Sequence, residues 1–248
     1  MIINFKSKHL IWIALLIFII GLIIILKKKK TDNLPPAHIR DKVAFTEDAG
    51  YFLRTGKESR KNIESALARI DKKLGSFHNI LDFGCGPGRT IRWLKEYSVN
   101  SKIYGTDVDA EAISWCQKNI DFANFSINKS LPPTEYEDEM FDFVYALSVF
   151  THLSESEQFA WLKELKRIMK PEAILLISLH GADTQNKLPR KYKKILDEEL
   201  FVHIKTERTG TFHSINYVYD NYSQYFKILD FIPASLQKSQ DIYILKKV

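Results

Sequence analysis

Three closely spaced glycines have the residue type and the position of a nucleotide-binding loop. Gly84, Gly86 and Gly88 directly follow the apolar run 79–83, which is predicted to be a buried strand. Glycines at such a point let the backbone approach a ligand and adopt positive φ angles. The spacing is G-x-G-x-G. It is not the dinucleotide-binding G-x-G-x-x-G, because Arg89 occupies the position of its third glycine, and this disfavours an NAD-dependent oxidoreductase.

An acidic residue follows at the end of the next predicted strand, 102–106. Asp107 closes the segment Tyr104–Asp107, about 25 residues after Asp82. A carboxylate at this point can accept both hydrogen bonds of a ribose diol. The alternative is that Asp107 only caps the following helix, but Asp109 is better placed for capping. We therefore expect Asp107 to bind a ribose.

Alternating strands and helices are predicted to position these residues. The apolar strand patterns lie at 79–83, 102–106, 123–128, 141–147 and 173–178, and the helical patterns at 58–74, 90–97, 110–119 and 154–170. Gly75 is expected to end the first helix. Ser154 and Glu157 form a capping box at the start of the last one, and Pro171 is expected to end it.

Beyond Gly181 the alternation weakens. A helix is predicted at 189–200, the segment 211–219 is ambiguous, and 227–232 with 241–246 predict an antiparallel hairpin. The predicted fold is α/β: a Rossmann-like, doubly wound, mostly parallel seven-stranded sheet with an antiparallel C-terminal hairpin.

The N-terminal segment has the pattern of one transmembrane helix. Residues 10–26 contain no charge, and as a helix they would span about 25 Å. A cleaved signal peptide is the alternative, but four lysines follow where small residues would mark a cleavage site. The excess of basic residues after the segment predicts that the rest of the chain faces the cytoplasm. The predicted domains are an anchor at 1–30, a linker at 31–44 and one catalytic domain at 45–248.

The net charge of +6 comes from this N-terminal segment. Its first 30 residues carry six lysines and no acidic residue, whereas the other 218 carry 30 basic and 30 acidic side chains. The bulk signature of a nucleic-acid binder is therefore missing, and no nucleic-acid partner is expected. Cys85 and Cys116 show no paired spacing, and the seven histidines show no ligand spacing, so no metal is expected.

Four ordered segments resemble the class I S-adenosylmethionine-dependent methyltransferases. ILDFGCGPGRT is similar to the first motif of that family, and YGTDVDAEAI to its second. MFDFVYALSVFTHL is similar to the fourth-strand motif, and LKRIMKPEAILLIS to the helix and strand that follow. FLRTGKESRKNI and QDIYILKK also resemble a bacterial subgroup often associated with glycan or small-molecule modification. The resemblance covers most of residues 45–248 and implies S-adenosylmethionine as the cofactor.

The resemblance implies a role for each matching residue. Asp82 would face the methionine part of the cofactor, and Asp107 would hold its ribose. The residues implied to line or contact the cofactor are Asp82, Gly84, Cys85, Gly86, Gly88, Asp107, Val108, Asn128, Ala146 and Leu147. Within this set Val108 would lie beside the adenine, and Asn128 would stand where the family often has an acidic residue against the adenine amino group.

The candidates for a general base are histidines. His180 follows the fifth predicted strand, and His213 lies in a segment that resembles part of the subgroup's substrate cap. For each of them, a packing or hydrogen-bonding role is favoured over that of a base. His152 precedes a helix and is expected to be structural. The acceptor, a small molecule, a glycan or a lipid-linked species, depends on segments 51–56 and 188–225. The alternative function is a membrane-bound binding or scaffold protein that has kept the fold without catalysis.

Overall fold

The computed structural model describes residues 34–44, 46–186, 201–204 and 210–248, together with residues 12, 13, 15, 16, 18 and 19. The predicted helix at 189–200 and most of the predicted membrane segment at 10–26 lie outside the described residues. Within the described residues, no helix is both long and apolar enough to cross a membrane.

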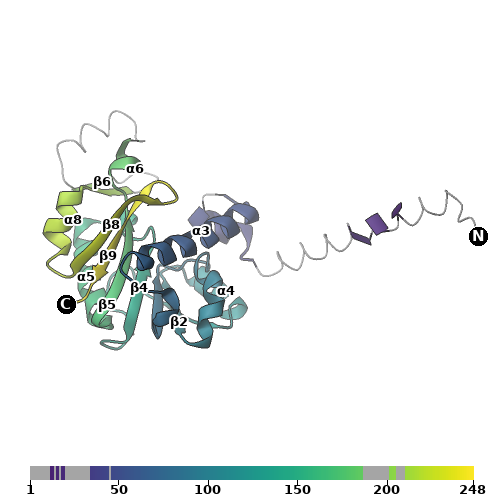
Figure 1. Ribbon diagram of the computed structural model, residues 1–248, viewed down its shortest axis with the longest axis horizontal. Coiled ribbons are helices and arrows are strands. Elements are labelled where there is room, and N and C mark those ends of the chain that lie inside the picture. Colours follow the sequence, from purple (N-terminus) through teal and green to yellow (C-terminus); the bar gives the residue numbers. More distant parts are fainter. Residues whose placement is uncertain are drawn as a thin grey trace, which may run out of the picture.

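A seven-stranded sheet forms the centre of the molecule, in the order β3-β2-β1-β4-β5-β9-β8 (Figure 1). Neighbouring strands from β3 to β5 run parallel, whereas β9 is antiparallel to both β5 and β8. The strands are β1 (Asn79–Phe83), β2 (Lys102–Asp107), β3 (Ala123–Ile127), β4 (Phe141–Ala146), β5 (Met169–Leu179), β8 (Lys227–Leu236) and β9 (Gln240–Lys246). The predicted mostly parallel sheet with its antiparallel C-terminal hairpin is confirmed.

Helices cover both faces of this sheet because the strands are apolar on both sides. Buried side chains of α3, η2 and α4 pack against one face, and those of α5 and α8 pack against the other (Figure 1). The helices are α2 (Ala37–Ala44), α3 (Ala49–Ala68), η1 (Leu74–Ser76), η2 (Ile91–Val99), α4 (Ala110–Asn119), η3 (Phe150–His152), α5 (Glu155–Ile168), α6 (Ala182–Asn186) and α8 (Ile215–Tyr222). A separate two-stranded sheet pairs β6 (Phe201–Ile204) with β7 (Gly210–His213).

Two predicted helix ends are wrong. The helix predicted at 58–74 is α3, which is capped by Asp48 and stops at Ala68, seven residues before Gly75. Asp71, not Gly75, has the left-handed backbone after this helix, with φ 54°. The early stop follows from burial: Ile63, Ala66 and Leu67 are fully buried, whereas the chain at Asp71–Lys73 turns through solvent.

Pro171 does not end α5, because β5 already begins at Met169. The β4–β5 pairing jumps from Phe141–Met169 to Phe143–Ile174, so residues 170–173 bulge out of the ladder. A proline is tolerated there because it has no N–H to contribute to the pairing. The capping box of Ser154 and Glu157 is confirmed at the start of α5.

The ambiguous segment 211–219 contains a strand end and a helix start. β7 ends at His213, and the Ser214 side chain accepts a hydrogen bond from the Tyr217 N–H to cap α8. The segment predicted as a linker, 31–44, includes helix α2, which packs beside α3.

Candidate active site

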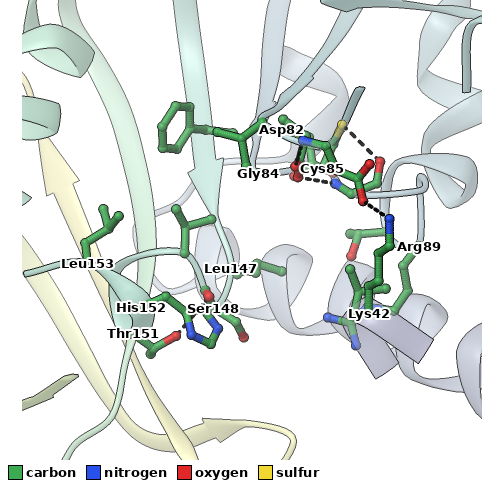
Figure 2. A pocket seen from close by; sticks show the side chains of 18 of the residues that line it. Lys42, Asp82, Gly84, Cys85, Arg89, Leu147, Ser148, Thr151, His152 and Leu153 are labelled. Carbon is green, nitrogen blue, oxygen red and sulfur yellow. Dashed lines mark hydrogen bonds and ion pairs between the residues drawn. The ribbon is translucent and has the colours of Figure 1, made fainter. Parts of the chain in front are cut away.

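A cavity of about 760 Å³ opens at the carboxyl ends of the parallel strands. In Figure 2, Asp82, Gly84 and Cys85 lie on one side of this cavity, and the segment from Leu147 to Leu153 lies on the other. Residues from α2, α3, β7 and the β8–β9 turn complete its walls, among them Lys42, Val43, Tyr51, Phe212, Gln237 and Gln240. Open parallel sheets bind their ligands at this edge.

The glycine loop is held open by its backbone geometry. Gly84 and Gly86 have φ angles of 77° and 50°, which favour glycine. The N–H groups of Gly84 and Cys85 donate to the Thr106 carbonyl at 2.8 and 3.0 Å, and this ties the loop to the end of β2. A Cβ on Gly84 would lie 2.2 Å from Cγ2 of Val149, so the loop passes too close to the β4 side for any other residue.

Two residues that we expected to line the cofactor do not line the cavity. Gly88, with φ 74°, faces the protein interior, where an added Cβ would lie 2.6 Å from Cδ1 of Ile120. Ala146 is fully buried within β4, and the cavity wall starts with Leu147. Gly88 therefore permits tight packing of the loop against α4. Cys85, by contrast, does line the cavity.

The Asp107 carboxylate lines the cavity, and each of its two oxygens accepts one hydrogen bond from a backbone N–H. Its Oδ2 accepts from the Gly86 N–H at 2.7 Å, and its Oδ1 accepts from the Asp109 N–H at 2.9 Å. An ionised carboxylate accepts about four hydrogen bonds, so about two positions remain for a ligand. Burial raises the pKa of Asp107, and the backbone amides oppose this rise. Asp109, not Asp107, caps α4 through the N–H groups of Glu111 and Ala112.

Val108, Asn128 and Leu147 also line the cavity. Val108 is 58% exposed, which leaves an apolar surface beside Asp107 for a flat ring. The Asn128 Oδ1 accepts from the Thr106 hydroxyl at 3.0 Å, and its Nδ2 donates to the Lys129 carbonyl at 2.7 Å. One lone pair of that oxygen is left for an amino group.

An acidic and a basic side chain, Asp82 and Arg89, both line the cavity beside the glycine loop. Burial raises the pKa of Asp82 to about 7, whereas the Tyr145 hydroxyl and the Arg89 charge pull it down. Arg89 lines the cavity, and burial lowers its pKa. Its guanidinium makes no hydrogen bond or ion pair with any residue that the structure describes. The pair can therefore hold a ligand that carries both an ammonium and a carboxylate group.

In the sequence, Arg89 stands out only because it interrupts a glycine pattern. The feature that could have indicated a binding role for Arg89 is its position directly after the glycine loop, at the carboxyl edge of the sheet. Gln237 and Gln240 could not be assigned to the site from the sequence, because they lie at the turn of the terminal hairpin, outside the four segments that resemble the cofactor motifs.

The three histidines have different environments. His180 lines the cavity at the end of β5, and its pKa is lowered to about 4, mainly by burial and then by His152. His152 is exposed at the cavity wall. His213 is 2% exposed and does not line the cavity; its Nε2 lies 2.9 Å from Oε1 of Gln158, and burial lowers its pKa to about 3. His213, a candidate general base, thus contacts Gln158 inside the domain and not the cavity.

Comparison with known proteins agrees with this fold. Residues 81–177 match the family model described as "Methyltransferase domain". The chain is 20% identical to the PH0226 protein of Pyrococcus horikoshii, with a TM-score of 0.58 over 77% of this chain and 91% of that one. A SAM-dependent methyltransferase from Aquifex aeolicus is 19% identical, with a TM-score of 0.56 over 81% of this chain and 99% of that one.

Among curated proteins, the tRNA N(3)-methylcytidine methyltransferase trm140 of Schizosaccharomyces pombe is 27% identical over 201 residues. That alignment covers 75% of this chain and 62% of trm140. The chain likewise spans only 41% and 58% of two further methyltransferase relatives. Residues 81–177 of this chain therefore match a methyltransferase domain. The fold is shared with a solved S-adenosylmethionine-dependent methyltransferase.

Proposed function

We propose that this protein transfers a methyl group from S-adenosylmethionine to an acceptor bound in the same cavity. The observation that carries the proposal is the Asp107 carboxylate, which is fixed by two backbone N–H groups and still has acceptor positions open beside the glycine loop. S-adenosylmethionine carries both a ribose diol and an ammonium–carboxylate pair, the groups that Asp107 and the Asp82–Arg89 pair can bind.

The residues present fit the cofactor along its whole length. Asp107 would accept the hydroxyl groups of the ribose, and Val108 with Asn128 would flank the adenine. Asp82 would face the ammonium group and Arg89 the carboxylate of the methionine part, since each lines the cavity with the complementary charge. Charge-assisted contacts of this kind are about twice as strong as neutral ones.

The bound cofactor supplies a methyl group that its sulfonium has already activated. The chain therefore contributes mainly by holding the acceptor in line and by excluding water. His180 lines the cavity and is neutral at pH 7, so a ring nitrogen can accept a proton, although the burial that lowers its pKa to about 4 makes it a weak base. His213 would support this wall from inside the domain through Gln158.

We further propose that residues 10–26 anchor the protein with its catalytic domain at the cytoplasmic membrane face. The described residues of this segment are helical, and their large apolar side chains are 43–68% exposed: Trp12, Ile13, Leu15, Leu16, Phe18 and Ile19. The lysines at 27–30 would lie at the head groups. A membrane-bound enzyme favours a lipid-linked or glycan acceptor, or an amphiphilic small molecule.

The test is the transfer of tritiated methyl groups from S-adenosylmethionine by the full chain in membranes. Extracts are separated into lipid, glycan, protein and RNA pools, and Asp107→Asn serves as the control. We expect label in the lipid or glycan pool that depends on Asp107. Label in the RNA pool would overturn the acceptor class. Binding of the cofactor without transfer to any pool would favour a scaffold role.

A further inference from the structure

The turn between β8 and β9 brings two glutamines to the cavity wall. Gln237, with φ 52°, lies in the turn, and Gln240 is the first residue of β9. Both line the cavity, and neither belongs to a segment that resembles the cofactor motifs. β9 lies four places from β2 in the sheet order, which separates Gln240 from the Asp107 strand by about 19 Å at the usual strand spacing. Gln240 therefore belongs to the part of the cavity beyond the ribose site.

Hydrogen bonds from β5 and from the segment after β4 fix the orientation of the Gln240 carboxamide. The Ser148 N–H donates to Oγ of Ser178 at 2.7 Å, so the Ser178 hydroxyl has its single proton left to donate. In the structure this proton is donated to Oε1 of Gln240, at 2.7 Å. The Ser148 hydroxyl donates to the same oxygen at 3.1 Å.

The amide nitrogen of Gln240 consequently has two N–H groups that are still available. It has no hydrogen-bond partner among the residues that the structure describes. Ser178 is fully buried, and Ser148 is held at φ 60°, an uncommon backbone angle for serine. Strained residues next to cavities persist where the surroundings hold them for a function.

We propose that Gln240 binds the methyl acceptor by donating a hydrogen bond from Nε2 to one of its oxygen atoms. Ser178 and Ser148 act as positioning residues that keep the oxygen of the carboxamide turned away from the cavity. The inference rests on the proposed methyltransferase function. It adds that the acceptor carries a hydrogen-bond-accepting oxygen, in a carbonyl, carboxylate or hydroxyl group, near the methylated atom.

Gln240→Glu separates this role from a structural one. The introduced carboxylate keeps an oxygen that accepts from Ser178 and Ser148, but it removes both N–H donors. A purely structural glutamine would therefore tolerate the change. Gln224→Glu is the matched control, because Gln224 is exposed and lies outside the cavity.

The experiment measures two quantities on the full chain in detergent micelles. The first is the dissociation constant of S-adenosylhomocysteine by calorimetry, and the second is the rate of tritiated methyl transfer against increasing amounts of membrane extract. For Gln240→Glu we expect an unchanged dissociation constant and about a tenfold rise in the half-saturating amount of extract. Gln224→Glu should match the wild type in both measurements.

Ser178→Ala should raise the half-saturating amount of extract by a smaller factor, because the carboxamide keeps one of its two partners. An unchanged half-saturating amount for Gln240→Glu would overturn the proposal. Equal losses in cofactor binding and in transfer would also overturn it, because Gln240 would then act on the cofactor side. A wild-type protein that binds no S-adenosylhomocysteine would instead overturn the methyltransferase function itself.

Discussion

Replacing Asp107 by asparagine changes one atom at the point where the ribose is expected to bind. In the wild type, Oδ2 accepts from the Gly86 N–H and Oδ1 from the Asp109 N–H, at 2.7 and 2.9 Å. An asparagine has one oxygen, so its NH₂ group must face one of these two N–H donors. The variant therefore loses the negative charge and one acceptor, and its remaining oxygen must serve both the backbone and the diol.

The expected loss follows from the hydrogen bonds involved. A hydrogen bond to a charged group contributes about 1.5–3 kcal/mol, and two such bonds to the diol are weakened or lost. We expect a net loss of about 3 kcal/mol, which raises the dissociation constant of S-adenosylhomocysteine about 150-fold. Calorimetry of the full chain in detergent measures this constant directly.

Asp121→Asn is the control for the change of charge, because the Asp121 side chain is 88% exposed and lies outside the cavity. A second control uses an S-adenosylhomocysteine analogue that lacks both ribose hydroxyls. Wild type and Asp107→Asn should bind this analogue about equally. A change of less than about threefold for the natural ligand would refute the reasoning, because even one lost hydrogen bond to a charged group exceeds it.

Three further predictions concern the glycine loop and its charges. Arg89→Gln should weaken S-adenosylhomocysteine binding by about 10- to 100-fold in calorimetry; an equal loss for an analogue without the carboxylate would contradict the assignment. Asp82 holds its proton more tightly in the folded state, with a pKa of about 7 against 3.8, so ligand-free stability falls as pH rises through this range. Asp82→Asn should therefore gain up to about 4 kcal/mol on the wild type at about pH 8 and lose that advantage near pH 4, measured by urea unfolding; a pH-independent difference would contradict this. Gly84→Ala, whose Cβ would lie 2.2 Å from Val149, should lose about 2–3 kcal/mol of unfolding free energy. Adding Val149→Ala should restore part of this stability. No recovery would show that backbone strain alone causes the loss.

Much of the fold could be predicted from local pattern. Short apolar runs predict the strands of the sheet, and the capping box at Ser154 predicts the start of α5. Pro171 misled the prediction because a proline is a helix terminator only where a helix would otherwise continue. Here the chain has already entered β5, in a bulge that needs no N–H from that residue.

Site residues could be predicted where they belong to a sequence motif. They could not be predicted where contacts between distant segments determine whether a side chain reaches the cavity. Asp107 lies at the cavity as expected. Gly88 has the expected positive φ, but α4 packs against it, and no sequence pattern says which side of a loop a helix will cover. His213 is enclosed by Gln158 and Tyr222, and Gln240 reaches the cavity through the order of the strands. Both facts depend on residues far apart in the chain.

The most direct test of the central claim is a calorimetric titration of the full chain with S-adenosylmethionine, with NADH titrated in parallel. We expect saturable binding of one S-adenosylmethionine per chain and no binding of NADH. An absence of S-adenosylmethionine binding at high micromolar ligand, in a sample shown to be folded, would contradict it.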